Sequence, residues 1–513
     1  MRRLRKKAFL LLAVMLALLL PVQAALAAPL EIGKVTVNGV EVQEGQEIIA
    51  NSNYVAVTGE VYSPEGKPTV KVGSVTCAVG SVRDAVYYDF SLPYLLKAGK
   101  NSITITASAG KAKDSYRFSV NYQALPLKDA KYIVPQLPTG GKIEAFNRAL
   151  ALKYPKNTIL LDPQGKPAVN ITITFTVYGD PDEAPPDFTP AGPVFCLSTS
   201  QEVYLSQQGQ LSLAFDPGIN AAVADQLTVW YSPDLDWDDN DNLNLGGLTD
   251  ARSKTVTIPF QFRDKEGYYA VFLGQKVFKE LSDSKFSKLR SPLLTLWAKG
   301  IVEPVTVGNS TNTHKKGYFG LVNDSNTEKP ITRLEFTTML VKGLGLPLST
   351  KPVSVFKDVY DNLSAAGIYA QAYNGNENDY DANSTYYKPS VRTYIETAIQ
   401  KGLVSGYIND EGELVFGPSD LLDRTEAAVI LAKAANLKIT ANGEKAKESL
   451  KKAFKDYQYI PSCAAPYVQA AYKAKLIEGR EGTDGFYFAP TENLFRAEAV
   501  AAIYRLLKSL KKI

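Results

Sequence analysis

The stretch LDRTEAAVILAKAANL, residues 422–437, decides the architecture of the C-terminal half because close relatives of it occur twice more. The related stretches are TRLEFTTMLVKGLGL from Thr332 and FRAEAVAAIYRLLKSL from Phe495. Counted from the arginine of each copy, apolar or small residues recur at +3, +6, +7, +10 and +11. This is the spacing of one buried helix face, so we predict three amphipathic helices that begin alike.

The polar residues at the beginning of each copy predict helix caps. Thr332 with Glu335, and Asp423 with Glu426, have the spacing of a capping box, in which a side-chain oxygen accepts a backbone amide and the acid reaches back. Phe495 stands in the cap position of the third copy and offers no acceptor.

The arginine of each copy, Arg333, Arg424 or Arg496, is not explained by capping. A cation in the first turn opposes the helix dipole, so another group must hold it. Two interpretations remain open at this point. Each arginine pairs with a neighbouring carboxylate, or its planar guanidinium and the helix-start amides bind an anion from outside the protein.

Each of these helices is the second half of a longer repeated unit. The unit opens with Phe-Lys at Phe278, Phe356 or Phe454, and continues as a helix that ends near WAKGIVEP, IQKGLVSGY or YKAKLIEGR. A loop of variable length and the arginine-bearing helix follow. Helix pairs with insertions confined to loops indicate one structural unit used three times.

These motifs resemble S-layer homology repeats. The resemblance rests on the blocks TRLE, DRTE and FRAE and on the preceding FGPSDLLDR and FAPTENLFR, and it covers about residues 278–513. The first copy has GLVNDSNTEKPITR in place of the Phe-x-Pro lead-in. The resemblance implies three repeats, at residues 275–350, 351–440 and 441–513, that form an all-α pseudo-threefold bundle and bind secondary cell-wall polysaccharide, often through its pyruvate ketal.

The family motif is Thr-Arg-Ala-Glu, whose arginine contacts the ligand carboxylate and whose neighbours shape the site. The resemblance therefore implies these glycan-binding residues: Arg333, Arg424, Arg496, Thr332, Glu335, Asp423, Glu426 and Glu498. Because the third copy lacks a cap, we expect its site to be the weakest.

Residues 1–28 read as a secretory signal peptide, with five positive charges, an apolar run from Ala8 to Leu20 and small residues near the end. Removing its five basic residues from the 57 Lys and Arg leaves 52 against 53 Asp and Glu, a net charge of about −1. This balance does not favour a nucleic-acid partner, and no later segment is apolar enough to span a membrane. We expect a secreted protein at the cell wall.

Residues 29–125 alternate with a period of two, and KVTVNGVEV carries Asn38-Gly39 where a type I′ hairpin turn would lie. We predict a β-sandwich that resembles bacterial immunoglobulin-like modules. Residues 126–274 are also β-rich, with one predicted helix, KIEAFNRALALKY, and one predicted exposed loop, GDPDEAPPDFTPAGP. Cys77, Cys196 and Cys463 are too scattered to predict disulfides.

Two further motifs carry residues of the kinds found in chemical sites. Asp236, Asp238, Asn240 and Asn242 alternate as calcium ligands do, but the EF-hand glycine and glutamate are missing, and we favour a solvated acidic loop. His314 is the single histidine, so a histidine-rich metal site is excluded and a histidine-based triad could use this residue alone. No cofactor is expected.

The fold predicted is multidomain, with all-β sandwich-like N-terminal domains followed by the helical repeats. The function predicted is a non-enzymatic cell-surface protein, of the S-layer or associated with it. The alternative is an anchored polysaccharide hydrolase with its active site in residues 126–274. Sequence leaves open whether the protein self-assembles and what it meets on its outward side.

Overall fold

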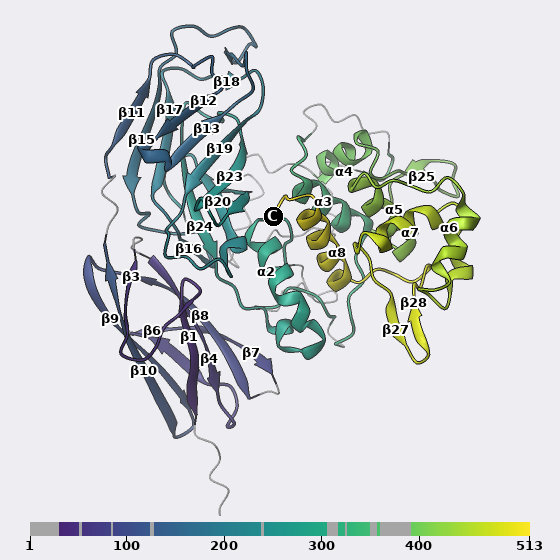
Figure 1. Cartoon of the computed structure of the whole chain (residues 1–513), viewed down its shortest axis with the longest axis horizontal. Helices are drawn as coiled ribbons and strands as arrows, with labels where there is room; N and C mark the ends of the chain where they lie inside the picture. Colours follow the sequence, from purple (N-terminus) through teal and green to yellow (C-terminus); the bar gives the residue numbers. More distant parts are fainter. Residues whose placement is uncertain are drawn as a thin grey trace, which may run out of the picture.

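The computed structural model of the 513-residue chain describes residues 30–50, 54–83, 86–123, 128–237, 241–304, 317–323, 326–348, 356–359 and 391–513. Two β-sandwiches are followed by a helical region, with helix α2 (Arg290–Ala298) between them and the remaining helices (Figure 1). The predicted signal peptide, His314, Asp238 and Asn240 lie outside the described residues.

The first sandwich consists of two five-stranded sheets, ordered β2-β1-β4-β8-β7 and β3-β10-β9-β5-β6. Its strands are β1 (Glu31–Val37), β2 (Val40–Glu41), β3 (Glu47–Ala50), β4 (Tyr54–Tyr62), β5 (Thr69–Val72), β6 (Val75–Thr76), β7 (Ala78–Arg83), β8 (Tyr87–Leu95), β9 (Gly99–Ala109) and β10 (Ala112–Tyr122). The predicted hairpin joins β1 to β2. Asn38 and Gly39 have φ of 49° and 78°, the positive values that a type I′ turn requires, which confirms this prediction.

The second sandwich packs a seven-stranded sheet, β11-β15-β17-β24-β20-β21 with β16 beside β24, against a five-stranded sheet, β12-β13-β19-β23-β22. Its strands are β11 (Lys131–Val134), β12 (Lys142–Ala145), β13 (Leu150–Lys153), β14 (Leu160–Leu161), β15 (Ile173–Gly179), β16 (Phe188–Pro190), β17 (Val194–Thr199), β18 (Tyr204–Leu205), β19 (Gly209–Ala214), β20 (Leu227–Ser232), β21 (Leu243–Gly246), β22 (Leu248–Asp250), β23 (Thr255–Phe260) and β24 (Glu266–Gly274). Strands β14 and β18 form a separate pair, and the short helix η2 (Ala224–Gln226) precedes β20.

The helix predicted for KIEAFNRALALKY is wrong. These residues form the hairpin of β12 and β13, joined by the single turn η1 (Phe146–Arg148). Asn147 has φ of 54°, which interrupts any helix, and burial alternates because Ile143 and Leu152 face the sandwich core. Sheet pairing with β19 has overridden the helix propensity of Ala, Leu and Lys.

The exposed loop predicted for GDPDEAPPDFTPAGP is half wrong. Asp182 and Glu183 are exposed as expected, but Phe188–Pro190 form β16 and pair with β24. Phe188 is buried because its ring stacks on Trp297 of α2, with 4.9 Å between ring centroids. A large aromatic side chain thus fixes a stretch whose prolines suggested a solvated loop.

The helical region has one continuous core, shared by all its helices. Its elements after α2 are α3 (Arg333–Leu344), α4 (Val391–Gln400), β25 (Tyr407–Ile408), β26 (Leu414–Val415), α5 (Arg424–Ala434), α6 (Gly443–Leu450), η6 (Tyr457–Tyr459), α7 (Ala465–Lys473), β27 (Arg480–Gly482), β28 (Gly485–Tyr487) and α8 (Arg496–Ser509). Before α2 come the short helices η3 (Lys279–Ser282) and η4 (Ser284–Leu289). The two small hairpins correct the expectation that the region is all-α.

Two sequence expectations are met by the described residues. The apolar faces of α3 and α8 are buried at the predicted positions, and the three cysteines are free. None of the helices that the structure describes combines the length and apolar composition needed to cross a membrane.

Helix α2 joins the second sandwich to the helical region through a shared core. Trp297 and Ala298 pack against Phe188 and Phe272 of the sandwich. The next residue, Lys299, is buried and its Nζ donates to the carbonyl oxygens of Leu227 (2.9 Å) and Gly247 (2.6 Å). Burial lowers the pKa of Lys299 to about 7.

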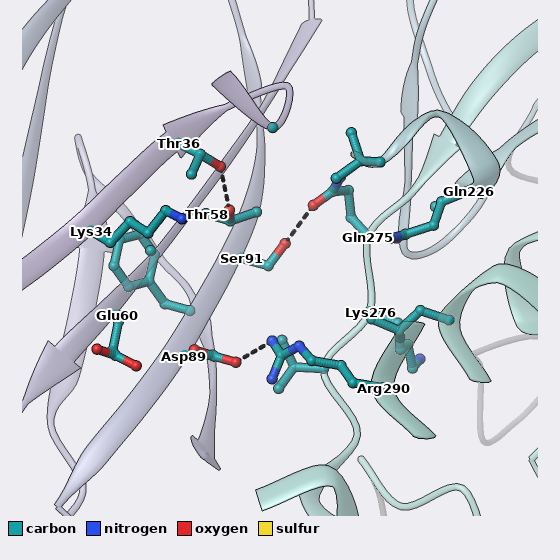
Figure 2. A pocket seen from close by; sticks show the side chains of 17 residues that line it. Lys34, Thr36, Thr58, Glu60, Asp89, Ser91, Gln226, Gln275, Lys276 and Arg290 are labelled. Carbon is teal, nitrogen blue, oxygen red and sulfur yellow. Dashed lines mark hydrogen bonds and ion pairs between the residues drawn. The ribbon is translucent and has the colours of Figure 1, made fainter. Parts of the chain in front are cut away.

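The first sandwich meets the rest of the molecule through a polar junction (Figure 2). A cavity of about 280 Å³ lies there between β8 of the sandwich and the segment that leads into α2. Asp89 forms an ion pair with Arg290, and Ser91 Oγ donates to Gln275 Oε1 at 3.0 Å. These contacts resemble the polar interfaces between domains of one chain, and Ala56 of β4 also packs into the core of the second sandwich.

Candidate functional site

The three arginine-bearing helices begin next to one another in the helical region. The extended residues before each helix form bridges between Pro330 and Phe495, Thr332 and Leu421, and Asp423 and Asn493. Each copy of the repeated motif therefore contacts both others, so the three helix starts have to be considered together.

The predicted caps are confirmed where an acceptor exists. The amide of Glu335 donates to Thr332 Oγ1 (3.2 Å) and the amide of Thr332 donates to Glu335 Oε2 (2.9 Å), which completes a capping box. Asp423 Oδ1 accepts from the amide of Glu426 at 2.7 Å, but the predicted capping box is not completed there, because the Glu426 carboxylate pairs with Arg333 instead of reaching back to Asp423. At α8 the side chain of Phe495 accepts nothing, and only the reverse bond, from its amide to the glutamate at position 498, is formed.

Each arginine pairs with the glutamate of another copy, and the three pairs close a cycle. The pairs are Arg333 with Glu426, Arg424 with Glu498 (2.5 Å) and Arg496 with Glu335 (2.5 Å). Helix α3 is thus bound to α5, α5 to α8, and α8 back to α3. The three arginines are 8%, 1% and 0% exposed in the same order.

The remaining guanidinium donors reach equivalent backbone oxygens. Each Nη2 donates to a carbonyl that follows the first helix of the repeat whose glutamate pairs with that arginine, as Arg333 to Ser405 (2.8 Å), Arg424 to Glu478 (2.5 Å) and Arg496 to Glu303 (3.1 Å). The Nε of Arg333 donates to Phe416 (2.9 Å) and that of Arg424 to Phe488 (2.6 Å). Arg496 Nε is buried and has no hydrogen-bond partner in the part of the chain that the structure describes.

These contacts agree with the interpretation in which each arginine pairs with a protein carboxylate. The sequence left the identity of that carboxylate open, and the structure places it in a different repeat. Contact of the arginines with an external anion stays a prediction.

A second set of residues, missed by the sequence analysis, orients the acceptors of these arginines. Asp456 accepts from the amides of Phe488 (2.8 Å) and Ala489 (2.7 Å), and Asp358 accepts in the same way from Phe416 and Gly417. Both acids follow the Phe-Lys motif that opens a repeat. The signal was therefore present in the sequence as Phe-Lys followed by an acid.

The first repeat has the equivalent contact, with a glutamate in place of the aspartate. Glu280 follows Phe278-Lys279 and accepts from the amides of Phe319, Gly320 and Leu321. Phe319-Gly320 thus stands where the other two copies have the Phe-x-Pro lead-in, so the first copy lacks the proline, as the sequence indicated, but keeps the phenylalanine. Only its proline is replaced, by Leu321.

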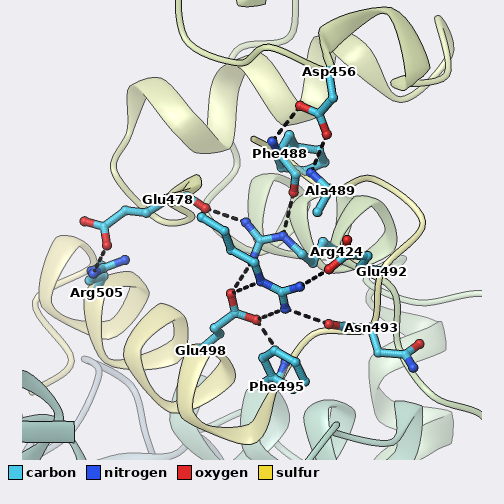
Figure 3. Close-up of polar contacts among 11 residues, drawn as sticks. Arg424, Asp456, Glu478, Phe488, Ala489, Glu492, Asn493, Phe495, Glu498 and Arg505 are labelled. Atoms are coloured by element: carbon cyan, nitrogen blue, oxygen red, sulfur yellow. Dashed lines mark hydrogen bonds and ion pairs between the residues drawn. The ribbon is translucent and has the colours of Figure 1, made fainter. Parts of the chain in front are cut away.

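The site around Arg424 is covered by a further arginine (Figure 3). Arg480 binds Glu498 through two nitrogens (2.9 and 2.7 Å), pairs with Glu492 (2.5 Å) and lies 4.4 Å from the centroid of the Phe495 ring. Burial raises the pKa of Glu498, but hydrogen bonds from Arg480 and the charge of Arg424 outweigh it, and the net shift is downward.

The site around Arg333 differs at the equivalent position. Tyr407 stands where the third copy has Arg480, its hydroxyl bonds to Asp420, and its ring centroid lies 5.9 Å from the Arg333 guanidinium carbon. Tyr407 is 43% exposed, so an aromatic face lies at the surface beside the guanidinium.

The acidic loop after β20 is described only in part. Asn242 Nδ2 donates to the carbonyl of Asp236 at 2.9 Å, and Asp238 and Asn240 lie outside the described residues. Within the described ranges no cluster of three or more acidic, histidine or cysteine side chains could hold a metal ion. Our preference for a solvated loop therefore stays a prediction.

Comparison with known proteins places one of the three copies in a family. Residues 453–500, from the opening of the third copy into α8, match the model of the S-layer homology domain. An amylopullulanase of Thermoanaerobacterium thermosulfurigenes is 24% identical over 435 residues, which is 80% of this chain and 19% of that protein. An endoglucanase of Bacillus sp. (strain KSM-635) is 29% identical over 177 residues, which is 34% of this chain and 15% of that protein.

The chain thus spans less than a fifth of the length of either relative. The domain match indicates anchoring at the cell surface and confirms the predicted location, secreted and associated with the cell wall. The caps and the arginine contacts agree with this match. The C-terminal part of this chain thus carries, at residues 453–500, a member of the S-layer homology domain family.

Proposed function

We propose that the protein is a non-enzymatic cell-surface protein held to secondary cell-wall polysaccharide by three S-layer homology repeats. The repeats lie at residues 275–350, 351–440 and 441–513 and form one pseudo-threefold unit. The observation that carries this proposal is the closed cycle of arginine–glutamate pairs. The arginine of each copy pairs with the equivalent glutamate of another copy, as expected for equivalent parts of one unit.

Contacts rather than the domain match support the inclusion of the first two copies in this proposal. They share with the matched third copy the acid after Phe-Lys, the carbonyl that receives Nη2 and the aromatic ring under the guanidinium. The rings are Phe416 under Arg333, Phe488 under Arg424 and Phe319 under Arg496, at 5.0, 5.5 and 5.1 Å. Unrelated helix pairs would not repeat this combination.

The arginines of this unit have two tasks in the proposal. Arg424 and Arg496 have almost no exposed surface, so they hold the helix starts and their neighbouring amides in fixed positions. Arg333, with 10% of its side chain exposed beside Tyr407, can also touch the polymer directly. Rigid, prearranged donors favour binding because little side-chain order has to be imposed on association.

A hydrolase is the second candidate function, because of the names of the two relatives. Both are enzymes acting on polysaccharides, and the alternative places an active site in residues 126–274. Incubation of the full chain with starch, pullulan and carboxymethyl cellulose, followed by a reducing-sugar assay, separates the candidates. Turnover that is lost on one Asp or Glu change within residues 126–274 would favour the hydrolase.

Cosedimentation with cell-wall sacculi tests the proposed anchoring. The full chain is the correct sample, because a fragment that begins at the repeats would expose Trp297 and Ala298, which pack on the second sandwich. We expect the chain to pellet with native sacculi and to stay in solution with sacculi from which acid has removed the secondary polymer. Equal binding to both preparations would identify peptidoglycan as the ligand instead.

A further inference from the structure

The first sandwich has one sheet whose outer face is exposed. Its junction with the rest of the molecule is made mainly by the other sheet, β2-β1-β4-β8-β7, through Asp89 and Ser91 of β8. The sheet that contains β9 and β10 lies on the side of the sandwich away from α2 (Figure 1). The outer face of this second sheet can therefore meet a partner outside the chain.

The pattern of β9 places a row of hydroxyl groups on this outer face. Every second residue from Ile103 to Ala109 is buried in the sandwich core, so the residues between them point outward. The row consists of Ser102, Thr104, Thr106 and Ser108. Alternate residues of a strand are about 6.8 Å apart, so the row extends over about 20 Å. Its length suits an extended chain better than a single small anion.

A hollow of about 520 Å³ lies over one end of this row. Thr106 pairs with Lys71 of β5 on one side, and Ser108 pairs with Lys113 of β10 on the other. The two lysines therefore flank β9 from opposite sides. Both are exposed, and neither forms an ion pair within the part of the chain that the structure describes.

The hollow keeps a net positive charge. Asp114 is the one acid in its described lining, and this carboxylate is turned to the opposite sheet, where it accepts the amide of Ile32 at 2.7 Å. Further along β10, the exposed Arg117 adds a third cation, with its Nε 3.4 Å from Thr104 Oγ1. Three cations thus lie along the same hydroxyl row.

The chemistry of these groups favours phosphate. A lysine is a compact point charge that binds phosphate well, whereas the planar fork of arginine is the better match for a carboxylate. Serine and threonine hydroxyls donate to the remaining phosphate oxygens. Among the described residues that line the hollow none is aromatic, so the hollow offers no ring for stacking on nucleic-acid bases and no aromatic anchor for a protein partner.

We propose that this outer face of the first sandwich binds a chain of sugar or polyol units linked by phosphodiesters. The phosphates lie at Lys71 and Lys113, and the hydroxyl row of β9 follows the chain between and beyond them. The site belongs to a different domain from the helical repeats, and it gives the first sandwich a ligand of its own.

Calorimetric titration of the full chain with poly(glycerol phosphate) tests the proposal. The double variant Lys71→Glu/Lys113→Glu reverses the charge of the hollow, and Thr106→Val removes one hydroxyl while keeping the shape of the side chain. The matched control is Lys156→Glu/Lys166→Glu, which changes the net charge equally at two exposed lysines of the second sandwich. Melting temperatures establish that each variant is folded.

We expect the double variant to bind at least tenfold more weakly and Thr106→Val several-fold more weakly, while the control binds as the parent protein does. With about three phosphate contacts, the affinity of the parent should fall roughly tenfold to twentyfold between about 50 and 200 mM salt.

Three results would overturn the proposal. The first is a folded double variant that binds as tightly as the parent, which would place the binding in the repeats. The second is an equal loss in the control, which would make net charge the cause. The third is a parent protein that does not bind poly(glycerol phosphate) at low salt, or that binds a single-stranded oligonucleotide more tightly.

Discussion

Replacing Arg424 by methionine removes one link of the arginine–glutamate cycle and nearly conserves side-chain length. Arg424 is 1% exposed and donates to Glu498 (2.5 Å), Glu478 O (2.5 Å) and Phe488 O (2.6 Å). The substitution leaves one buried and two partly buried acceptors without their donor. Unpaired buried acceptors cost free energy because they have lost water without gaining a partner.

The expected loss of stability follows from these contacts. Breaking a buried ion pair by removing one partner costs about 3–5 kcal/mol. Glu498 keeps two hydrogen bonds from Arg480, so its charge remains compensated and the loss falls toward the lower limit, about 3 kcal/mol. The same substitution at Arg505, whose ion pair with Glu478 is largely exposed, should cost less than about 1 kcal/mol.

Urea unfolding followed by circular dichroism at 222 nm measures the difference, since helices dominate that signal. Tryptophan fluorescence would not serve, because Trp230, Trp237 and Trp297 all lie at the junction of the second sandwich with α2. The reasoning is refuted if Arg424→Met unfolds at the same urea concentration as Arg505→Met. A loss of binding without loss of stability would equally show that Arg424 serves the ligand rather than the fold.

Three further outcomes are expected from the structure. Burial lowers the pKa of Lys299 from 10.5 to about 7, so between these pH values the unfolded protein binds more protons than the folded protein. From pH 7 to 9 the stability of the parent protein should therefore rise relative to Lys299→Met, by up to about 1.4 kcal/mol per pH unit in parallel melts. A stability difference that does not change with pH would contradict the burial of a chargeable amine. Asp456→Asn should lower stability by about 2 kcal/mol in urea melts, since it weakens two charge-assisted bonds to the amides of Phe488 and its neighbour. Gly274→Ala should cost about 1–3 kcal/mol in the same assay, because a Cβ there would lie 2.6 Å from Cβ of Ala298, and a neutral effect would show that the α2 contact is loose.

The helical region was predictable where the signal is local. The cap at Thr332, the cap at Asp423 and the absence of one at Phe495 follow from residue type and spacing, and all three are observed. The apolar face of each repeated helix is equally local, because burial follows a 3.6-residue period.

Partners that come from another repeat were not predictable. The sequence indicated only that each arginine has a neighbouring carboxylate as partner, whereas Arg424 pairs with Glu498 of α8 and its own Glu426 pairs with Arg333 of α3. Which glutamate is near depends on how three helix starts are brought together, and no pattern within one repeat contains this information. The acid at Asp456 was recognisable after Phe-Lys, but its role needed the position of the Phe488 amide.

The two wrong predictions for the second sandwich, a helix and an exposed loop, have a common cause. The segment around Asn147 has the composition of a helix, and the stretch before Phe188 has that of a loop. Contacts with distant strands and with Trp297 decided both conformations. Tertiary packing overrides local propensity in such cases, particularly for β-structure.

Calorimetric titration of the purified secondary polymer into the full chain tests the central claim most directly. We predict saturable binding that weakens as salt is raised, since the proposed ligand is an acidic polymer that meets an arginine-bearing helix start, and no heat of binding with peptidoglycan fragments that lack the polymer. Saturable binding to those fragments, or no binding to the polymer under conditions where the chain is folded, would contradict the account.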